Sequence, residues 1–136
     1  MAVRTMFVGV SMAAAGVLLV SIPLVAHHAA ATLDTGKEIT FKATVTEWIW
    51  ANPHCFLLFD AKDDTGKVRN WAVETQNPTS MTSRGWSRTS FKVGDEVTVT
   101  IEPAKNGEPV GRILTAVTAS GQKLVAANPT PPAPTR

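Results

Sequence analysis

Side chains that commonly act in catalysis are scarce in this chain. Its 136 residues include no tyrosine, three histidines and a single cysteine, Cys55. A lone cysteine excludes an intramolecular disulfide framework. Its neighbours in "HCFLLF" predict a small buried side chain, in preference to an intermolecular disulfide or a soft metal ligand. Because adjacent strand residues face opposite ways, His54 and Cys55 make a poor base–nucleophile pair. No glycine-rich phosphate loop and no Cys-x-x-Cys motif occurs, so the sequence favours a non-catalytic protein.

Charge is nearly balanced overall but missing from the start of the chain. Thirteen basic residues oppose eleven acidic ones with no basic run or stripe, so nucleic acid is not expected as a partner. Residues 5–25 carry no charge, and Arg4 precedes them. This layout is typical of a secretory signal peptide, which we assign to residues 1–26. We therefore expect a periplasmic or secreted protein without membrane contact after signal removal; the alternative is an uncleaved membrane anchor.

The position of the signal cleavage decides whether two histidines remain in the mature protein. A cut after Ala26 lies close to the end of the apolar run and makes His27 the first residue. A cut after Ala31 matches the small-x-small rule better, because Ala29 then stands three places before the cut. That second cut discards both His27 and His28. The sequence leaves the two cuts open.

Alternation of apolar and polar residues predicts a succession of strands. In the first strand, over residues 40–50, Phe41, Ala43 and Val45 alternate with polar residues. The alternation breaks at residues 47–49, where a β-bulge is expected. The further strands are expected over residues 54–63, 67–75, 96–104 and 111–120, with a short return strand over 120–125.

A short helix is expected after the third strand. Asn77 can cap it with Pro78 at its first position, and Gly85 would end it after about two turns. The order of three strands, a helix and two strands is that of the OB-fold. We therefore predict an all-β fold: a small OB-like barrel of five to six strands, with one short helix between the third and fourth strands. A five- or six-stranded open β-sandwich is the alternative.

Composition divides the chain into four parts. The signal peptide, residues 1–26, is followed by an extended lead-in over residues 27–38 and the OB-like β domain over residues 39–126. Residues 127–136 form a proline-rich tail without periodicity, which is expected to be disordered. The domain is large enough to fold around a core of its own without disulfides.

The stretch "EWIWANPHCF" is the densest in candidate binding residues. Asn52 precedes a proline and so favours an extended or turn conformation, which would present His54 at the mouth of a hairpin. In OB-folds the second and third strands and nearby loops commonly bind ligands, and aromatic rings there stack on bases or sugars. We predict Trp48, Trp50, Asn52 and His54 as ligand-binding residues. The alternative is that both tryptophans fill the barrel.

Other conspicuous side chains are expected to be structural. Trp71 and Trp86 should lie in the barrel core. Two acids on mostly apolar strand faces are expected to form ion pairs with arginines of the helical segment. The acids are Asp60 and Glu74, and the arginines are Arg84 and Arg88.

The three histidines suggest a metal site. If the signal is cut after Ala26, the free amine and ring of His27 can chelate a metal, and His28 can add an amide nitrogen and a second ring. His54 would supply a third imidazole if the fold brings it near. Nitrogen-rich sites of this kind suit Cu(II), so copper is the metal expected at His27, His28 and His54. The alternative is that the histidine pair is merely a polar stretch around the cut.

Several motifs together resemble one protein family. They are "AHH" after the signal, "EWIWANPH", "NWAVE", "RGWSRTSFKVGDEVTV" and "PAKNGEPVGRI", spread over residues 26–125. As a set they are similar to a family of small secreted bacterial proteins that is known as a domain of unknown function. The resemblance implies a secreted OB-like β domain and no assigned reaction. All three histidines fall on motif positions, which favours the metal site.

These observations predict an exported, non-catalytic binding or accessory protein. Its partner would be an unknown small ligand, with copper as the sharper hypothesis, or an envelope protein. Two alternatives stay open. One is a metal-dependent enzyme of unknown reaction that uses the same histidines, and the other is an envelope structural or interaction module.

Overall fold

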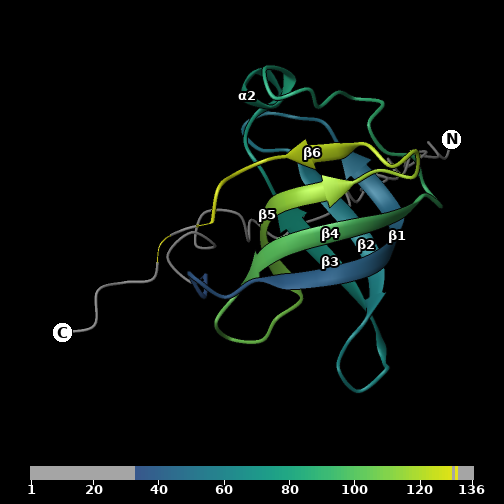
Figure 1. Ribbon diagram of the computed structural model, residues 1–136, viewed down its shortest axis with the longest axis vertical. Coiled ribbons are helices and arrows are strands. Elements are labelled where there is room, and N and C mark those ends of the chain that lie inside the picture. Colours follow the sequence, from purple (N-terminus) through teal and green to yellow (C-terminus); the bar gives the residue numbers. More distant parts are fainter. Residues whose placement is uncertain (1–32, 130, 132–136) are drawn as a thin grey trace, which may run out of the picture.

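The computed structural model describes residues 33–129 and 131 (Figure 1). The predicted signal peptide, its cut, His27, His28 and most of the proline-rich tail lie outside these residues. No helix in the described ranges has the length and hydropathy that a membrane crossing needs.

In the part of the chain that the structure describes, five strands form a closed barrel, accompanied by a sixth strand and one short helix (Figure 1). The elements are β1 (Ile39–Ile49), β2 (Phe56–Lys62), β3 (Val68–Glu74), α2 (Pro78–Thr82), β4 (Glu96–Pro103), β5 (Val110–Val117) and β6 (Lys123–Val125). Neighbouring strands follow the order β3-β2-β1-β4-β5-β6, and a parallel ladder between β3 and β5 closes the first five into a barrel. This confirms the OB-like barrel with its helix between β3 and β4, and not the open sandwich.

The long strand β1 serves both halves of the barrel. Its first half pairs with β4 and its second half with β2. The register with β2 shifts between Val45 and Glu47, so a bulge bends the strand there. The bulge lies directly before residues 47–49, where the alternation was predicted to break. Before it, Phe41, Ala43 and Val45 are buried as their spacing predicted.

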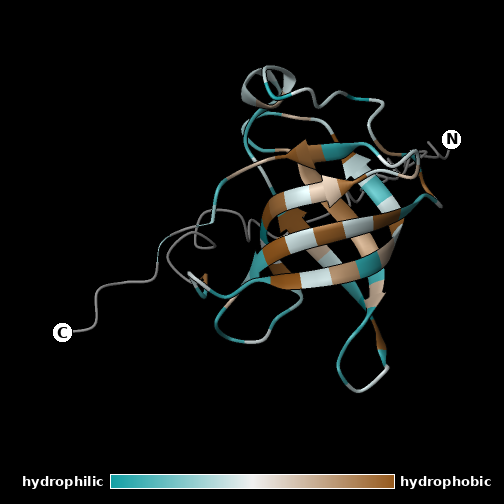
Figure 2. Cartoon of the chain, viewed as in Figure 1, coloured by the Kyte–Doolittle hydropathy of each residue, from teal (hydrophilic) through white to brown (hydrophobic). Residues whose placement is uncertain are grey.

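The barrel interior is apolar and is filled largely by alternate residues of the strands. Figure 2 shows the resulting alternation of hydrophobic and hydrophilic residues along the strands. Trp71 and Trp86 are 5% and 1% exposed, which confirms both as core residues. Phe41 and Phe59 pack against the ring of Trp71. Cys55 is fully buried, as its apolar neighbours predicted.

The helix begins as expected and ends earlier. The Asn77 Oδ1 accepts a hydrogen bond of 3.0 Å from the Ser80 backbone N–H, and Pro78 takes the first helical position. The prediction that the helix continues to Gly85 was wrong, because α2 stops at Thr82. Gly85, with φ of +86°, instead reverses the chain after the helix, so that the Trp86 N–H reaches back to the Met81 carbonyl.

The expected partners of the two strand acids also differ from those in the structure. Asp60 accepts a hydrogen bond of 2.8 Å from the Asn70 side chain on the neighbouring strand. Glu74 lies opposite Arg112 in the β3–β5 ladder. The residues beside these two acids are therefore set by strand pairing and not by the helical segment.

Candidate functional site

Trp48, near the end of β1, contacts the segment that follows α2 and holds it against the end of the barrel. Its Nε1 donates a hydrogen bond of 3.0 Å to the Ser87 carbonyl. Its ring meets Phe91 edge-on, with 5.1 Å between the ring centroids, and lies 5.6 Å from the ring of Trp50. Both Trp48 and Trp50 are partly exposed while packing against the core. Trp48 thus has a packing role in the described structure, and Trp50 keeps part of its ring on the surface.

His54 sits on the turn between β1 and β2, beside the end of β3. Its Nδ1 lies 3.0 Å from the Thr75 backbone carbonyl. A carbonyl can only accept, so Nδ1 carries the proton of this hydrogen bond, and in a neutral ring the lone pair is on Nε2. Nε2 is then left as an acceptor or metal ligand. The preceding Asn52 is exposed and is joined to Pro53 by a cis peptide bond.

Two backbone hydrogen bonds position the histidine. The Cys55 N–H donates to the Gln76 carbonyl, and the Thr75 N–H donates to the Cys55 carbonyl. They extend the β2–β3 ladder, in which Phe56 faces Glu74, by one further step. Because side chains alternate along a strand, His54 projects to the outer face that also carries Glu74, while Cys55 projects into the core.

His54 lines a small cleft on the outer face of the barrel. The cleft has a volume of about 120 Å³. It is formed by the ends of β2 and β3, the first half of β5 and the chain that follows β6. Its lining residues are His54, Glu74, Thr75, Gln76, Arg112, Ile113, Ala126 and Ala127.

A row of charged side chains runs across the strands at this cleft. Arg112 on β5 stands opposite Glu74 in the parallel ladder and opposite Glu102 in the antiparallel one. The Arg112 guanidinium forms an ion pair with the Glu102 carboxylate, which is 0% exposed. Two acids and one base give this row a formal charge of minus one. A cation therefore suits the cleft better than an anion does.

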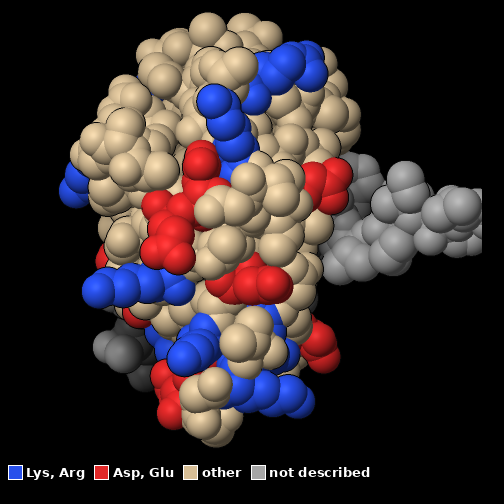
Figure 3. Space-filling model, turned by 90° about the vertical axis from the view of Figure 1, so that its right-hand side faces the viewer, with Lys and Arg blue, Asp and Glu red and all other residues tan. Residues whose placement is uncertain are grey.

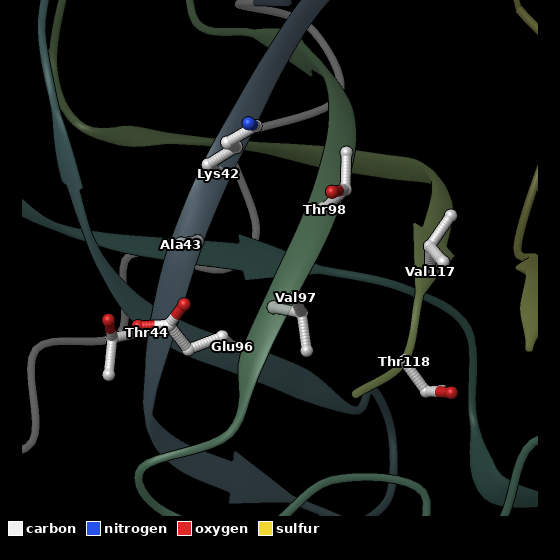
Figure 4. A pocket seen from close by; sticks show the side chains of 8 residues that line it. All are labelled: Lys42, Ala43, Thr44, Glu96, Val97, Thr98, Val117 and Thr118. Carbon is white, nitrogen blue, oxygen red and sulfur yellow. The ribbon is translucent and has the colours of Figure 1, made fainter. Parts of the chain in front are cut away.

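A larger, shallower groove lies on the outer face of β1, β4 and β5 (Figure 4). Its volume is about 350 Å³. The side chains of Thr44, Thr98 and Thr118 contribute hydroxyl groups, and Lys42 and Glu96 contribute opposite charges. The groove contains none of the residues predicted to bind a ligand or a metal.

The predicted site residues divide between two places. Trp48 and Trp50 lie together at the end of the barrel, whereas His54 lines the cleft with side chains from β3 and β5. Trp48, Trp50 and Asn52 are not among the cleft residues, and their role in ligand binding stays a prediction. Within residues 33–129 and 131, no group of three or more His, Cys, Asp or Glu side chains is arranged to hold a metal ion. A copper site at His54 thus depends on His27 and His28, outside the described residues.

Sequence reasoning missed Glu102 and Arg112. The one available signal was their position: an acid near the end of one strand and a base near the start of the next, on either side of the "KNGEP" turn. Residues placed in this way face each other in a hairpin.

The fold and the cleft define a class of protein: a small OB-like β-barrel with a histidine beside an Arg–Glu row on its outer face. Residues 14–113 match the family described as "Family of unknown function (DUF6152)". The match spans well over half of the chain, so the chain belongs to this family. Comparisons with curated proteins and with solved structures each gave no match.

Proposed function

We propose that this is an exported, non-catalytic binding protein, and that its ligand is Cu(II), held by His54 together with His27 and His28 of the mature N-terminus. The observation that carries the proposal is the hydrogen bond from His54 Nδ1 to the Thr75 carbonyl. Metal-binding histidines commonly donate their second nitrogen to a carbonyl or carboxylate, which fixes the ring and leaves the other nitrogen for the metal.

The charges around His54 favour the same kind of ligand. The row of Glu74, Glu102 and Arg112 carries a formal charge of minus one beside the cleft. A divalent cation at Nε2 would be attracted by that charge. An anionic ligand would have to overcome two carboxylates to reach the single guanidinium.

The N-terminal histidines are within reach of the cleft. Leu33 forms an antiparallel bridge with Ala104, just after the end of β4. In the β4–β5 hairpin, Pro103 pairs with Gly111 and Glu102 with Arg112, which lines the cleft. His28 precedes Leu33 by five residues, and an extended chain spans about 3.3 Å per residue, or about 17 Å over that stretch. That length exceeds the three strand spacings of about 4.8 Å each, or about 14 Å, that lead from Leu33 across β4 and β5 to Glu74 on β3.

The proposal of binding without catalysis draws on Cys55. Its side chain is fully buried, pointing into the core just before β2 begins, and burial raises the pKa of its thiol. A buried thiol of raised pKa is a poor nucleophile. A copper-dependent oxidative enzyme that uses the same histidines is the second candidate, and it would differ in turning over with an oxidant and a reductant. An envelope interaction module would bind no copper.

We extend the proposal to the origin of the protein and to the motifs of its family. We infer a bacterial protein whose Ala-His-His start, Trp-x-Asn-Pro-His segment and Arg-Gly-Trp segment mark its family. The His-containing motifs are the ones that the copper proposal uses.

The deciding experiment is a copper titration of the protein recovered from an exporting host, after its intact mass has fixed the first residue. We expect a chain that begins at His27, and His54→Ala should weaken Cu(II) binding by more than about tenfold, or about 1.4 kcal/mol. The control is Gln122→Ala, an exposed residue in the turn between β5 and β6, which should leave the titration unchanged.

Two results would contradict the proposal. A mature chain that begins at Thr32 would lack both leading histidines. An unchanged titration for His54→Ala would remove this side chain from the copper site.

A further inference from the structure

Two segments at one end of the barrel contain no acidic residue. Residues 48–59 carry neither Lys, Arg, Asp nor Glu, and residues 75–94 carry three cations and no carboxylate. The cations are Arg84, Arg88 and Lys92, which we call the basic rim. This local excess is hidden in the nearly balanced charge of the whole chain.

The basic rim is exposed and unneutralised. All three of its side chains are exposed. In the described part of the chain, no carboxylate lies within ion-pair distance of any of them. The nearest acid in the sequence, Asp95, accepts a hydrogen bond from the backbone N–H of Lys92.

Aromatic packing holds the rim beside a partly exposed tryptophan. The Ser87 carbonyl and the Phe91 ring, each next to a rim residue in the chain, both contact Trp48. Trp48 in turn packs against Trp50, with 5.6 Å between the ring centroids. Trp48 thus links Trp50 and the end of β1 to the segment that carries the rim, and we treat their exposed parts together as one candidate surface.

This surface is open and rich in hydroxyl groups. Seven of residues 79–90 are Ser or Thr, and five of these side chains are exposed: Thr79, Thr82, Ser83, Ser87 and Thr89. On the face that Figure 3 shows, Lys or Arg side chains stand above all the Asp and Glu, at the end where α2 lies in Figure 1, and acidic side chains begin directly below them. Neither the cleft nor the groove includes a rim residue. An extended polymer fits such a surface better than a small anion does.

We propose that the basic rim and Trp50 bind a linear anionic polysaccharide. The three cations would pair with carboxylates repeated along the polymer, and the exposed hydroxyl groups would bond to its sugar hydroxyls. The Trp50 ring would offer an apolar face to a sugar ring, as aromatic side chains do at binding surfaces. Binding by separated surface charges should weaken as salt is added.

The probe is polygalacturonate, a linear polymer of uronic acid, with neutral dextran for comparison. The full mature protein should bind polygalacturonate at low salt and not dextran. Arg84→Gln with Arg88→Gln should weaken binding by about three- to tenfold, the loss expected when two exposed charge contacts are removed. Near-ultraviolet circular dichroism would verify that this variant keeps its fold.

A matched variant removes the same charge at another place. Lys62 and Lys67 are exposed and flank the β2–β3 hairpin, which points away from α2 in Figure 1. Lys62→Gln with Lys67→Gln should leave binding within about twofold, since surface charges far from a contact matter little in salt. Equal loss in both double variants, or equal binding of dextran, would overturn the proposal.

The exposed side chain of Val93 calls for one further test, of binding to a lipid surface. It is 76% exposed next to Lys92, a combination that also suits a lipid surface. Vesicles with anionic headgroups are therefore tested beside polygalacturonate. Binding to the vesicles and not to the polysaccharide would likewise overturn the proposal.

Discussion

The indole Nε1 of Trp86 donates a hydrogen bond of 3.1 Å to the backbone carbonyl of Val125. Val125 ends β6, the last strand of the sheet, so the bond occupies an edge carbonyl that would otherwise be open to another chain. Trp86 also lies 6.0 Å from Trp48 and 5.6 Å from Phe91, measured between ring centroids. One side chain therefore joins the segment after α2 to β1, in the middle of the strand order, and to β6, at its edge.

We expect Trp86→Ala to lower the free energy of unfolding by about 3 to 5 kcal/mol, because it removes a buried indole and leaves a cavity. Trp86→Phe keeps much of the packing and loses the hydrogen bond, so its cost should be smaller by at least about 1 kcal/mol. Guanidinium denaturation measures both. A loss below about 1 kcal/mol for Trp86→Ala would contradict its place in the core.

The Glu102–Arg112 ion pair allows a second prediction. Glu102→Leu alone should lower stability by about 2 to 4 kcal/mol, because it leaves the Arg112 guanidinium beside a buried apolar side chain. This loss of stability should be smaller than the loss on breaking a fully buried ion pair, because 32% of the Arg112 side chain is exposed.

Adding Arg112→Met to Glu102→Leu should recover much of this loss, as apolar replacements of buried pairs often do. A double-mutant cycle by urea denaturation gives the coupling between the two residues. Additive losses would show that the two side chains do not act as a pair.

Cys55 makes the third prediction, on pH. Burial raises the pKa of its thiol in the folded protein, so the unfolded chain ionises first as the pH rises. The stability that Cys55 contributes is therefore complete below the ordinary thiol pKa and is lost as the pH rises above it. Wild type should lose stability above about pH 9 that Cys55→Ala does not lose, as measured by thermal unfolding.

The same burial should protect the thiol from reagents. Near pH 8 a disulfide reagent should label native Cys55 at least about tenfold more slowly than the chain unfolded in guanidinium. Equal labelling rates would mean that the thiol is accessible in the native state.

Much of the fold was predictable because local chemistry and topology agree in this chain. Alternation identified the buried face of β1, and Asn77 with Pro78 identified where α2 begins. The predicted end of α2 was too late. A glycine after a helix indicates that the chain reverses there, but it does not show how many residues lie between the last helical residue and the glycine.

The candidate site was less predictable, because strand pairing assembles it. His54 stood out as a rare residue beside a turn, but Glu102 and Arg112 become neighbours only through a register that shifts between Thr100 and Ile101. A shift of one residue would send each side chain to the other face of the sheet. Composition and spacing along the chain do not determine such a register.

The parallel ladder that joins β3 to β5 has a consequence for how the protein comes to be folded. Antiparallel neighbours can pair as soon as a turn brings them together, but Ala72 waits for Val110, which lies beyond the helix and the whole of β4. During synthesis, which starts at the N-terminus, the strands before β5 can therefore form only an open, curved sheet. Arg112 is part of β5, so it joins the sheet in the step that closes the barrel. The cleft is therefore complete only when the barrel is closed, so any partner that recognises the cleft also recognises a finished fold.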